Sequence, residues 1–216
     1  MPTNETEWDA RYRASAERKL TSVSGCVLPL GESIDIVSEW LPLSPRGAAL
    51  DIACGAGRYS LLLAAQGRSV TAIDSSGEAL KILETRAQSL KLPATRSDTI
   101  SAEGRHDRGI QLVQANLEEI RLPDSAYALI LCIRYLQRSL FPQMARALEP
   151  GGLLLFETFT RAQLNYDGGP RNPAHLLEPG ELRSAFPELR VLFYRELNAG
   201  QGIASLVARK PERSGR

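Results

Sequence analysis

The 216-residue sequence contains few of the residues from which several classes of functional site are built. Its three cysteines, Cys26, Cys54 and Cys132, are too few and too scattered for a disulfide framework or a CxxC metal site. Its two histidines, His106 and His175, cannot assemble a histidine-rich zinc site. We therefore expect no bound metal, and a chain that works in the reducing environment of the cytoplasm.

Long hydrophobic runs and an excess of charge of one sign are also missing. The longest apolar stretches, such as residues 129–133, fall far short of the ~18–20 residues that cross a bilayer. The first twenty residues are polar and lack the apolar core of a signal peptide. With 26 basic and 25 acidic residues the net charge is +1, which gives no electrostatic argument for nucleic acid or an anionic membrane. The expected partner is a small molecule, and no oligomeric state is predicted.

The sequence does contain a regular alternation of short apolar runs and helical patterns. Strands are expected at 48–53, 69–73, 110–114, 126–133 and 153–159, and helices at 59–66, 76–90 and 139–148. This alternation indicates βαβ units and a parallel sheet with helices on both faces. Two last runs, 189–195 and 203–208, are separated by asparagine and glycines and indicate an antiparallel hairpin. The prediction is a doubly wound α/β domain of seven strands, the last of them antiparallel.

We expect one domain to use the whole chain, residues 1–216. Its parts are an N-terminal helical lid over 1–45 with helices at 5–20 and 32–41, a core over 46–210, a flexible insertion over 92–109, a substrate-side loop over 160–180 and a tail over 211–216. Long loops inside a compact domain are usually functional or disordered. The loop at 160–180 follows the carboxyl end of a strand, where open α/β sheets bind ligands.

The most informative segment is a glycine turn between the first strand and its helix, Asp51-Ile-Ala-Cys-Gly55-Ala-Gly57. Without a Cβ, these glycines let the backbone bend sharply and lie against a ligand. Asp74 ends the second strand, 17 residues after Gly57. In a βαβ unit this position brings a carboxylate to the hydroxyls of a ribose. The order of strand, turn, helix, strand and acid therefore predicts a nucleoside ligand.

Two residues favour one nucleoside over another. Ser60 stands where a dinucleotide site has its third glycine, and Asp51 lies four residues before Gly55. A carboxylate in this pocket repels a pyrophosphate but attracts an ammonium or sulfonium group. The pattern favours S-adenosylmethionine. A nicotinamide-dependent oxidoreductase and a non-catalytic nucleoside-binding module are the alternatives.

At this point the sequence resembles the class I S-adenosylmethionine-dependent methyltransferases over residues 48–210. The matching motifs are the glycine turn, Val70-Thr-Ala-Ile-Asp74, and Ala147-Leu-Glu-Pro-Gly-Gly152 before a strand. The resemblance implies a Rossmann-like fold with strand order 3-2-1-4-5-7-6. It implies that the cofactor-binding residues are Tyr12, Asp51, Ala53, Gly55, Gly57, Asp74, Ser75, Asn116, Leu117 and Cys132, with Asn116 at a position where many relatives carry aspartate.

Within the class, three segments are similar to the small tellurite-resistance-type methyltransferases. They are Trp8-Asp-Ala-Arg-Tyr12, Arg134-Tyr135 and Asn172-Pro-Ala-His-Leu-Leu-Glu-Pro-Gly-Glu-Leu182. Arg134 is the leading clamp for an acceptor anion, because guanidinium binds oxyanions through two parallel hydrogen bonds. His175 is a candidate general base. Further acceptor contacts are expected from Trp8, Arg11, Tyr135, Tyr166 and Arg171.

The pattern lacks an obvious base beside the expected pocket. Soft nucleophiles need positioning more than proton removal, so a thiol or a selenium or tellurium oxyanion product is favoured as the acceptor, with other small metabolites left open.

Overall fold

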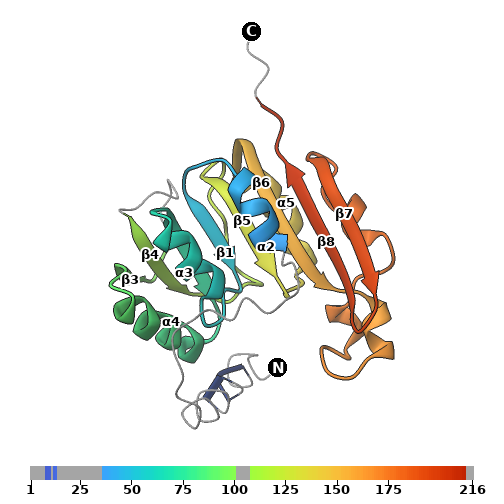
Figure 1. Cartoon of the computed structure of the whole chain (residues 1–216), viewed down its shortest axis with the longest axis horizontal. Helices are drawn as coiled ribbons and strands as arrows, with labels where there is room; N and C mark the ends of the chain where they lie inside the picture. Colours follow the sequence, from blue (N-terminus) through green and yellow to red (C-terminus); the bar gives the residue numbers. More distant parts are fainter. Residues whose placement is uncertain (1–7, 11, 14–35, 101–107, 213–216) are drawn as a thin grey trace.

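The computed structural model describes residues 8–10, 12–13, 36–100 and 108–212, and its main feature is one eight-stranded sheet. The strands are β1 (Ala49–Ile52), β2 (Ser69–Asp74), β3 (Ala94–Ser97), β4 (Gly109–Gln114), β5 (Tyr127–Ile133), β6 (Leu148–Phe159), β7 (Arg190–Asn198) and β8 (Gly202–Arg209). Their order across the sheet is β3-β4-β2-β1-β5-β6-β8-β7 (Figure 1). The strands from β3 to β6 pair in parallel, and β8 is antiparallel to both its neighbours.

Helices cover both faces of this sheet. In Figure 1, α2 (Ile36–Trp40) and α3 (Arg58–Ala65) lie in front of it, and α4 (Gly77–Ser89) contributes to the same apolar cluster. On the other face, α5 (Phe141–Ala147) and α6 (Glu181–Ser184) contribute to a second cluster. Single 3-10 turns occupy Leu41–Leu43, Arg138–Leu140, Arg161–Asn165 and Pro173–His175. Because apolar side chains pack on both faces, a central strand such as β5 is a nearly continuous apolar run.

The predicted α/β architecture and its strand order are confirmed. The seven predicted strands correspond to β1, β2 and β4 to β8, and they stand in the expected order with β8 antiparallel. Parallel strands place their carboxyl ends at one edge of a sheet. The glycine turn after β1, Asp74 at the end of β2 and Arg134 after β5 therefore share that edge.

The structure differs from the prediction within residues 92–109. Four of these residues form β3, which pairs with β4 at the edge of the described sheet, so the expectation of an irregular segment is wrong there. The sequence Ala-Thr-Arg-Ser is half-buried or exposed throughout, so it carries no alternation of apolar and polar residues that would indicate a strand. Residues 101–107 lie outside the described residues.

The expected lid is described only in part. Residues 8–10 and 12–13 are helical, and this short piece contacts the start of α4, where Asp9 accepts hydrogen bonds from the Ser76 hydroxyl and from the Glu78 N–H. Arg11, residues 14–35 and the tail from residue 213 lie outside the described residues.

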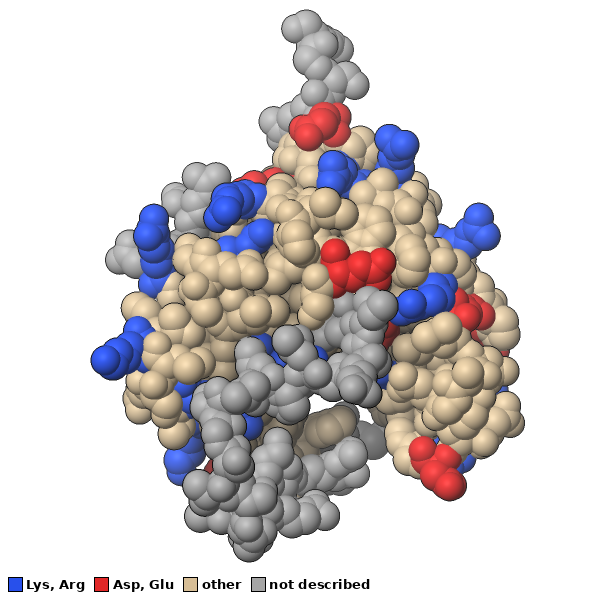
Figure 2. All heavy atoms as spheres, in the orientation of Figure 1, with Lys and Arg blue, Asp and Glu red and all other residues tan. Residues whose placement is uncertain are grey.

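Charged side chains are spread over the surface. On the face shown in Figure 2, the basic and acidic side chains of the described residues form no single large patch of one sign. Within the same residues, no helix has the length and apolar character that spanning a membrane requires.

Candidate functional site

A cavity of about 460 Å³ opens at the carboxyl edge of the sheet. It extends from the glycine turn after β1 to the β7–β8 hairpin, and residues 12 and 86 of the N-terminal piece and α4 also contribute to its wall. Its size is that of an ordinary small-molecule site. The side chains and backbone that line it belong to Tyr12, Asp51, Ala53, Cys54, Gly55, Ala56, Arg58, Tyr59, Arg86, Ile133, Arg134, Glu157, Arg195, Leu197, Gln201 and Ile203.

The glycine turn adopts a conformation that side chains would disrupt. Gly55 and Gly57 have φ angles of +53° and +77°, in the left-handed region that L-residues rarely adopt. A Cβ on Gly55 would collide with the hydroxyl of Tyr12, and one on Gly57 would collide with Leu83 of α4. Gly57 is also the residue from which α3 begins. The turn therefore offers bare backbone at the wall of the cavity.

Asp51 brings a buried carboxylate to this wall. Its exposed fraction is 2%, and its Oδ2 accepts a hydrogen bond of 2.6 Å from the Ser60 hydroxyl. Burial raises the pKa of Asp51 to about 7, although the Ser60 hydrogen bond acts in the opposite direction. Ser60, at the place of a third glycine, is thus the hydroxyl that orients Asp51. A buried carboxylate with one protein partner suits a cationic group.

Asp74 connects two loops at the same edge. Its Oδ2 accepts the Gly55 N–H at 2.7 Å and its Oδ1 accepts the Ser76 N–H at 2.9 Å. Burial raises its pKa, and the two backbone hydrogen bonds lower it. Each carboxylate oxygen can accept a second hydrogen bond, so Asp74 retains capacity for a ligand. Its own side chain is not part of the cavity wall.

The residues expected around an adenine follow the next strand ends. Ser75 comes directly after β2 and its carbonyl accepts a hydrogen bond from Gln114 at the end of β4. Asn116 is exposed, and its side chain accepts the Glu118 N–H at 3.1 Å, whereas Leu117 is buried in the core. None of the three predicted residues lines the cavity as it stands. Their grouping beside Asp74 agrees with the expected position, but their role stays a prediction.

Cys132 lies in the core at the end of β5. Its thiol is fully buried and 3.7 Å from the Tyr135 carbonyl, and burial raises the pKas of both Cys132 and Tyr135. Neither side chain lines the cavity. With its thiol held in the neutral form, Cys132 acts as a packing residue beneath the site.

Arg134 does line the cavity, in a constrained position. Its φ is +63°, and its N–H donates to the Glu157 carbonyl at 2.6 Å. Its guanidinium donates to Gln201 Oε1 at 3.1 Å, approaches Glu157 Oε1 to 3.4 Å and lies 4.7 Å from the centre of the Phe159 ring. Glu157 is 8% exposed, and its other oxygen accepts the Ser205 hydroxyl at 2.7 Å. A positive and a negative group are therefore fixed side by side in the wall of the cavity.

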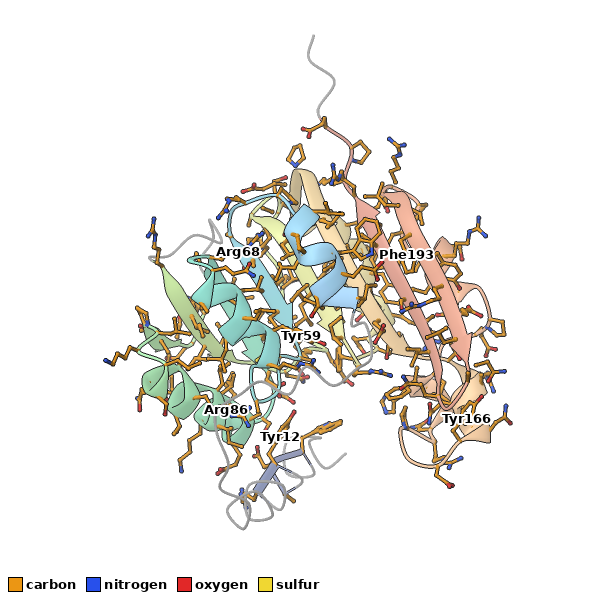
Figure 3. All side chains as sticks on the ribbon, in the orientation of Figure 1. Tyr12, Tyr59, Arg68, Arg86, Tyr166 and Phe193 are labelled. Atoms are coloured by element: carbon orange, nitrogen blue, oxygen red, sulfur yellow. The ribbon has the colours of Figure 1, made fainter. Side chains whose placement is uncertain are left out.

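The other predicted acceptor residues are not brought to the cavity. Tyr166 donates to Asn198 Oδ1 at 3.0 Å, and Arg171 donates to the carbonyls of Leu164 and Tyr166. Figure 3 shows Tyr166 on its own loop, well apart from Tyr12. The remaining positions fall outside the wall as well: His175 is exposed in the turn Pro173–His175, Trp8 is 42% exposed, and Arg11 is not among the described residues.

Sequence reasoning missed several residues that do line the cavity. Arg58 comes from α3, Arg86 comes from α4, and Glu157 lies near the carboxyl end of β6. Arg195 and Gln201 come from the terminal hairpin. Arg58 was detectable, because it directly follows the glycine turn. Arg86 depends on how α4 packs beside the turn, and Glu157, Arg195 and Gln201 depend on how β6, β7 and β8 are aligned, which no motif reveals.

Comparisons with known proteins agree with this geometry. Residues 50–156 match a family model described as a methyltransferase domain. The structure of TehB from Haemophilus influenzae is 19% identical, with a TM-score of 0.64 over 92% of this chain and 67% of that one. Magnesium protoporphyrin IX methyltransferase from Synechocystis, solved with S-adenosylhomocysteine, is 14% identical, with a TM-score of 0.61 over 96% and 99%. The [4+2]-cyclase SpnF is 17% identical, with a TM-score of 0.63 over 82% and 79%.

A search of curated proteins gave no match. At these identities the solved structures show the fold alone, and one of them is not named as a methyltransferase. The family match and the geometry of the site together identify the family more specifically than the solved structures do. A buried acid, a turn with two glycines at which a Cβ would collide, and an acid at the end of β2 fit the amino-acid end and the ribose of the family's cofactor. The chain therefore belongs to the class I S-adenosylmethionine-dependent methyltransferases, and S-adenosylmethionine is its cofactor.

Proposed function

We propose that this methyltransferase acts on a small soft or anionic acceptor, such as a thiol, a selenium or tellurium oxyanion-type compound or a small metabolite. The observation that carries the proposal is the cavity of about 460 Å³, whose wall includes Asp51 and the glycine turn as well as Arg134 and Glu157. A cavity of this volume is of the size that takes a small molecule. The near-neutral charge of the chain favours the same class of acceptor.

In this proposal the chain holds the cofactor at three points. Asp51 binds the ammonium group, and the backbone from Gly55 to Gly57 lies against the rest of the methionyl part. Asp74 receives the ribose hydroxyls through the acceptor capacity that its two backbone partners leave free. Ser75, Asn116 and Leu117 frame the adenine. Ala53 and Tyr12 close the cavity around it, with Cys132 packed beneath.

S-adenosylmethionine supplies a methyl group on a positively charged sulfur, and the sulfur is the leaving group when a nucleophile attacks the methyl carbon from the opposite side. The chain's contribution is therefore to hold the acceptor atom about 3–3.5 Å from its target in a site that excludes water. Arg134 is fixed for this by Gln201, Glu157 and the Phe159 ring. Ile133 and Ile203 add apolar wall beside it.

The lining of the cavity supports an acceptor that needs little help in losing a proton. Among the described residues that line it there is no histidine, and Asp51 faces the expected cofactor end. The Glu157 carboxylate already has protein partners, because one oxygen lies 3.4 Å from the Arg134 guanidinium and the other accepts the Ser205 hydroxyl. A thiol or another group that ionises near neutral pH suits this arrangement.

Calorimetry and turnover test the proposal. S-adenosylhomocysteine should bind the purified full chain, and Asp51→Asn should weaken that binding. Asp124→Asn, an exposed acid far from the cavity wall, serves as the matched control and should leave it unchanged. Labelled methyl donor should then be consumed with at least one of a thiol, selenite, tellurite and a small phenol. Binding of NADH without S-adenosylmethionine would contradict the proposal, and cofactor binding without any turnover would favour a nucleoside-binding module.

We further propose that this protein is cytoplasmic and that nucleic acid is not its acceptor. The composition supports both statements, through scarce cysteine and balanced charge. Methylation assays with total RNA and DNA as acceptors provide the check, and incorporation above the level of the Asp51→Asn variant would contradict the second statement.

A further inference from the structure

The terminal hairpin aligns a row of polar side chains with the cavity. Glu157 of β6 is the register partner of Ser205 of β8, and Ser205 is in turn the register partner of Arg195 of β7. Directly opposite residues of antiparallel strands project from the same face of a sheet. Glu157, Ser205 and Arg195 therefore form one row on one face, and both ends of the row line the cavity.

Arg195 is the member of this row that has a buried nitrogen without a partner among the described residues. Within the described part of the chain, its Nε is buried from solvent and has no hydrogen-bond partner. Its guanidinium lies 5.5 Å from the centre of the Phe193 ring, two residues earlier on the same strand. Phe193 in turn packs on Trp40 of α2, with 5.8 Å between the ring centres. Aromatic packing thus supports a guanidinium whose buried donor is unpaired, which costs free energy unless a ligand pairs with it.

Other arginines of the cavity have protein acceptors. Arg86 donates to the Ala56 carbonyl at 3.0 Å, and Arg134 has Gln201 and Glu157. No carbonyl or carboxylate among the described residues pairs with the Arg195 Nε, and the neighbour of Arg195 in the row, Ser205, donates its hydroxyl to Glu157.

The charges that line the cavity also favour the binding of an anion. Four arginines, Arg58, Arg86, Arg134 and Arg195, line it against two carboxylates, Asp51 and Glu157. The sulfonium of the cofactor adds a further positive charge. An anionic acceptor would compensate this excess, whereas a neutral or cationic one would leave it unbalanced.

We infer that Arg195 binds an oxyanion group of the methyl acceptor, at the end of the cavity away from Asp51. A guanidinium presents parallel N–H donors that match a carboxylate or a phosphate. Leu197 and Ile203 line the cavity next to it, so an acceptor with an apolar body and one oxyanion fits this end. The oxyanion serves as a handle and is distinct from the atom that receives the methyl group. This inference rests on the proposed function, and it makes Arg195 a specificity-determining residue.

Probe anions test the inference without requiring that the true acceptor be known. The full chain is saturated with S-adenosylhomocysteine and titrated by calorimetry with benzoate, phenyl phosphate and the neutral probe benzamide. At least one anion should bind about tenfold or more tightly than benzamide, as expected for a charge-assisted hydrogen bond. Which anion is preferred distinguishes a carboxylate handle from a phosphate handle.

The variants are Arg195→Ala, Arg195→Lys and the matched control Arg190→Ala, an exposed arginine of the same strand. The anion preference should disappear in Arg195→Ala, persist in reduced form in Arg195→Lys and remain intact in Arg190→Ala, while the affinity for S-adenosylhomocysteine stays unchanged in all three. A wild-type protein that binds S-adenosylhomocysteine but shows no anion preference, or a preference that survives in a folded Arg195→Ala, overturns the inference and leaves the proposed function standing. Failure of the wild-type protein to bind S-adenosylhomocysteine overturns both.

Discussion

Cofactor affinity should fall as the pH drops below neutrality, because Asp51 must be ionised to attract an ammonium group. Burial raises the pKa of Asp51 to about 7 in the protein without ligand. At pH 6 about one tenth of the molecules then carry the ionised carboxylate, and at pH 5 about one hundredth. The apparent Kd for S-adenosylhomocysteine is the intrinsic value divided by this fraction, so it should rise by about tenfold for each unit below pH 7.

Isothermal titration calorimetry between pH 5 and 7.5 measures this dependence. Above that range the amino group of the ligand itself begins to titrate, so the interval isolates the protein carboxyl. Repeating the titration at pH 6 in buffers of different ionisation enthalpy should show release of nearly one proton per ligand bound. Asp51→Asn should bind weakly, with a Kd that is nearly flat over the interval. A wild-type Kd that changes less than threefold between pH 5 and 7 would refute the assignment of the ammonium group to Asp51.

Two variants add independent checks. Because the Ser60 hydrogen bond lowers the pKa of Asp51, Ser60→Ala should move the inflection of the binding curve to higher pH. The raised pKa also means that ionisation of Asp51 destabilises the folded protein when no ligand is bound. This loss in the free energy of unfolding is absent below about pH 4 and complete above about pH 7. A shift of about three pKa units corresponds to about 4 kcal/mol. Urea unfolding at pH 8 should therefore find the empty Asp51→Asn variant more stable than wild type by up to that amount, and the difference should shrink toward pH 4.

Three further substitutions probe the turn, the ribose contact and the late loop. Gly57→Ala should lower the free energy of unfolding by about 2–4 kcal/mol in urea titrations, because a Cβ there meets Leu83. The control Gly67→Ala has the same φ of +77° but open space around it, so it should lower the free energy of unfolding by only about 1–2 kcal/mol. Equal losses in the two variants would contradict the packing argument. Asp74→Asn should raise the calorimetric Kd for S-adenosylhomocysteine by about tenfold or more, through weaker hydrogen bonds to the ribose, and an unchanged Kd would exclude that contact. Arg138→Ala removes donors to the carbonyls of residues 174 and 176, so limited proteolysis should cut the loop at 160–180 faster than in the wild-type protein. The Tm should change little, because the Arg138 side chain is largely exposed. An unaltered cleavage rate would show that the loop is held by other contacts.

The core of the fold could be predicted because its strands carry strong local patterns. β1, β2 and β5 are short apolar runs bounded by glycine, acid or arginine, and the helices between them have clear limits. Ser76 illustrates this, since its hydroxyl caps α4 by accepting the Ala79 N–H. β3 could not be predicted, because an edge strand of half-exposed polar residues lacks any apolar alternation.

The cofactor end of the site was more predictable than the acceptor end. Asp51 and Gly55 lie in one continuous motif whose geometry follows from local backbone conformation. Arg195 and Glu157 meet the cavity through strand register over a separation of tens of residues, which a single sequence does not encode in any short motif. Tyr166 was expected at the cavity because it lies in the right loop, but a side chain in a loop can be used to stabilise the loop itself, as its hydrogen bond to Asn198 shows.

The position of β8 has a consequence for synthesis of the chain. Among the described strands β8 is translated after all the others, yet it pairs on one side with β6 and on the other with β7, whose sole pairing in the described sheet is with β8. During vectorial folding on the ribosome, β7 must therefore wait unpaired until β8 emerges. The half of the cavity formed by β1, β2 and β5 can be assembled earlier, so a nascent chain becomes able to hold the methyl donor before it can select what to methylate.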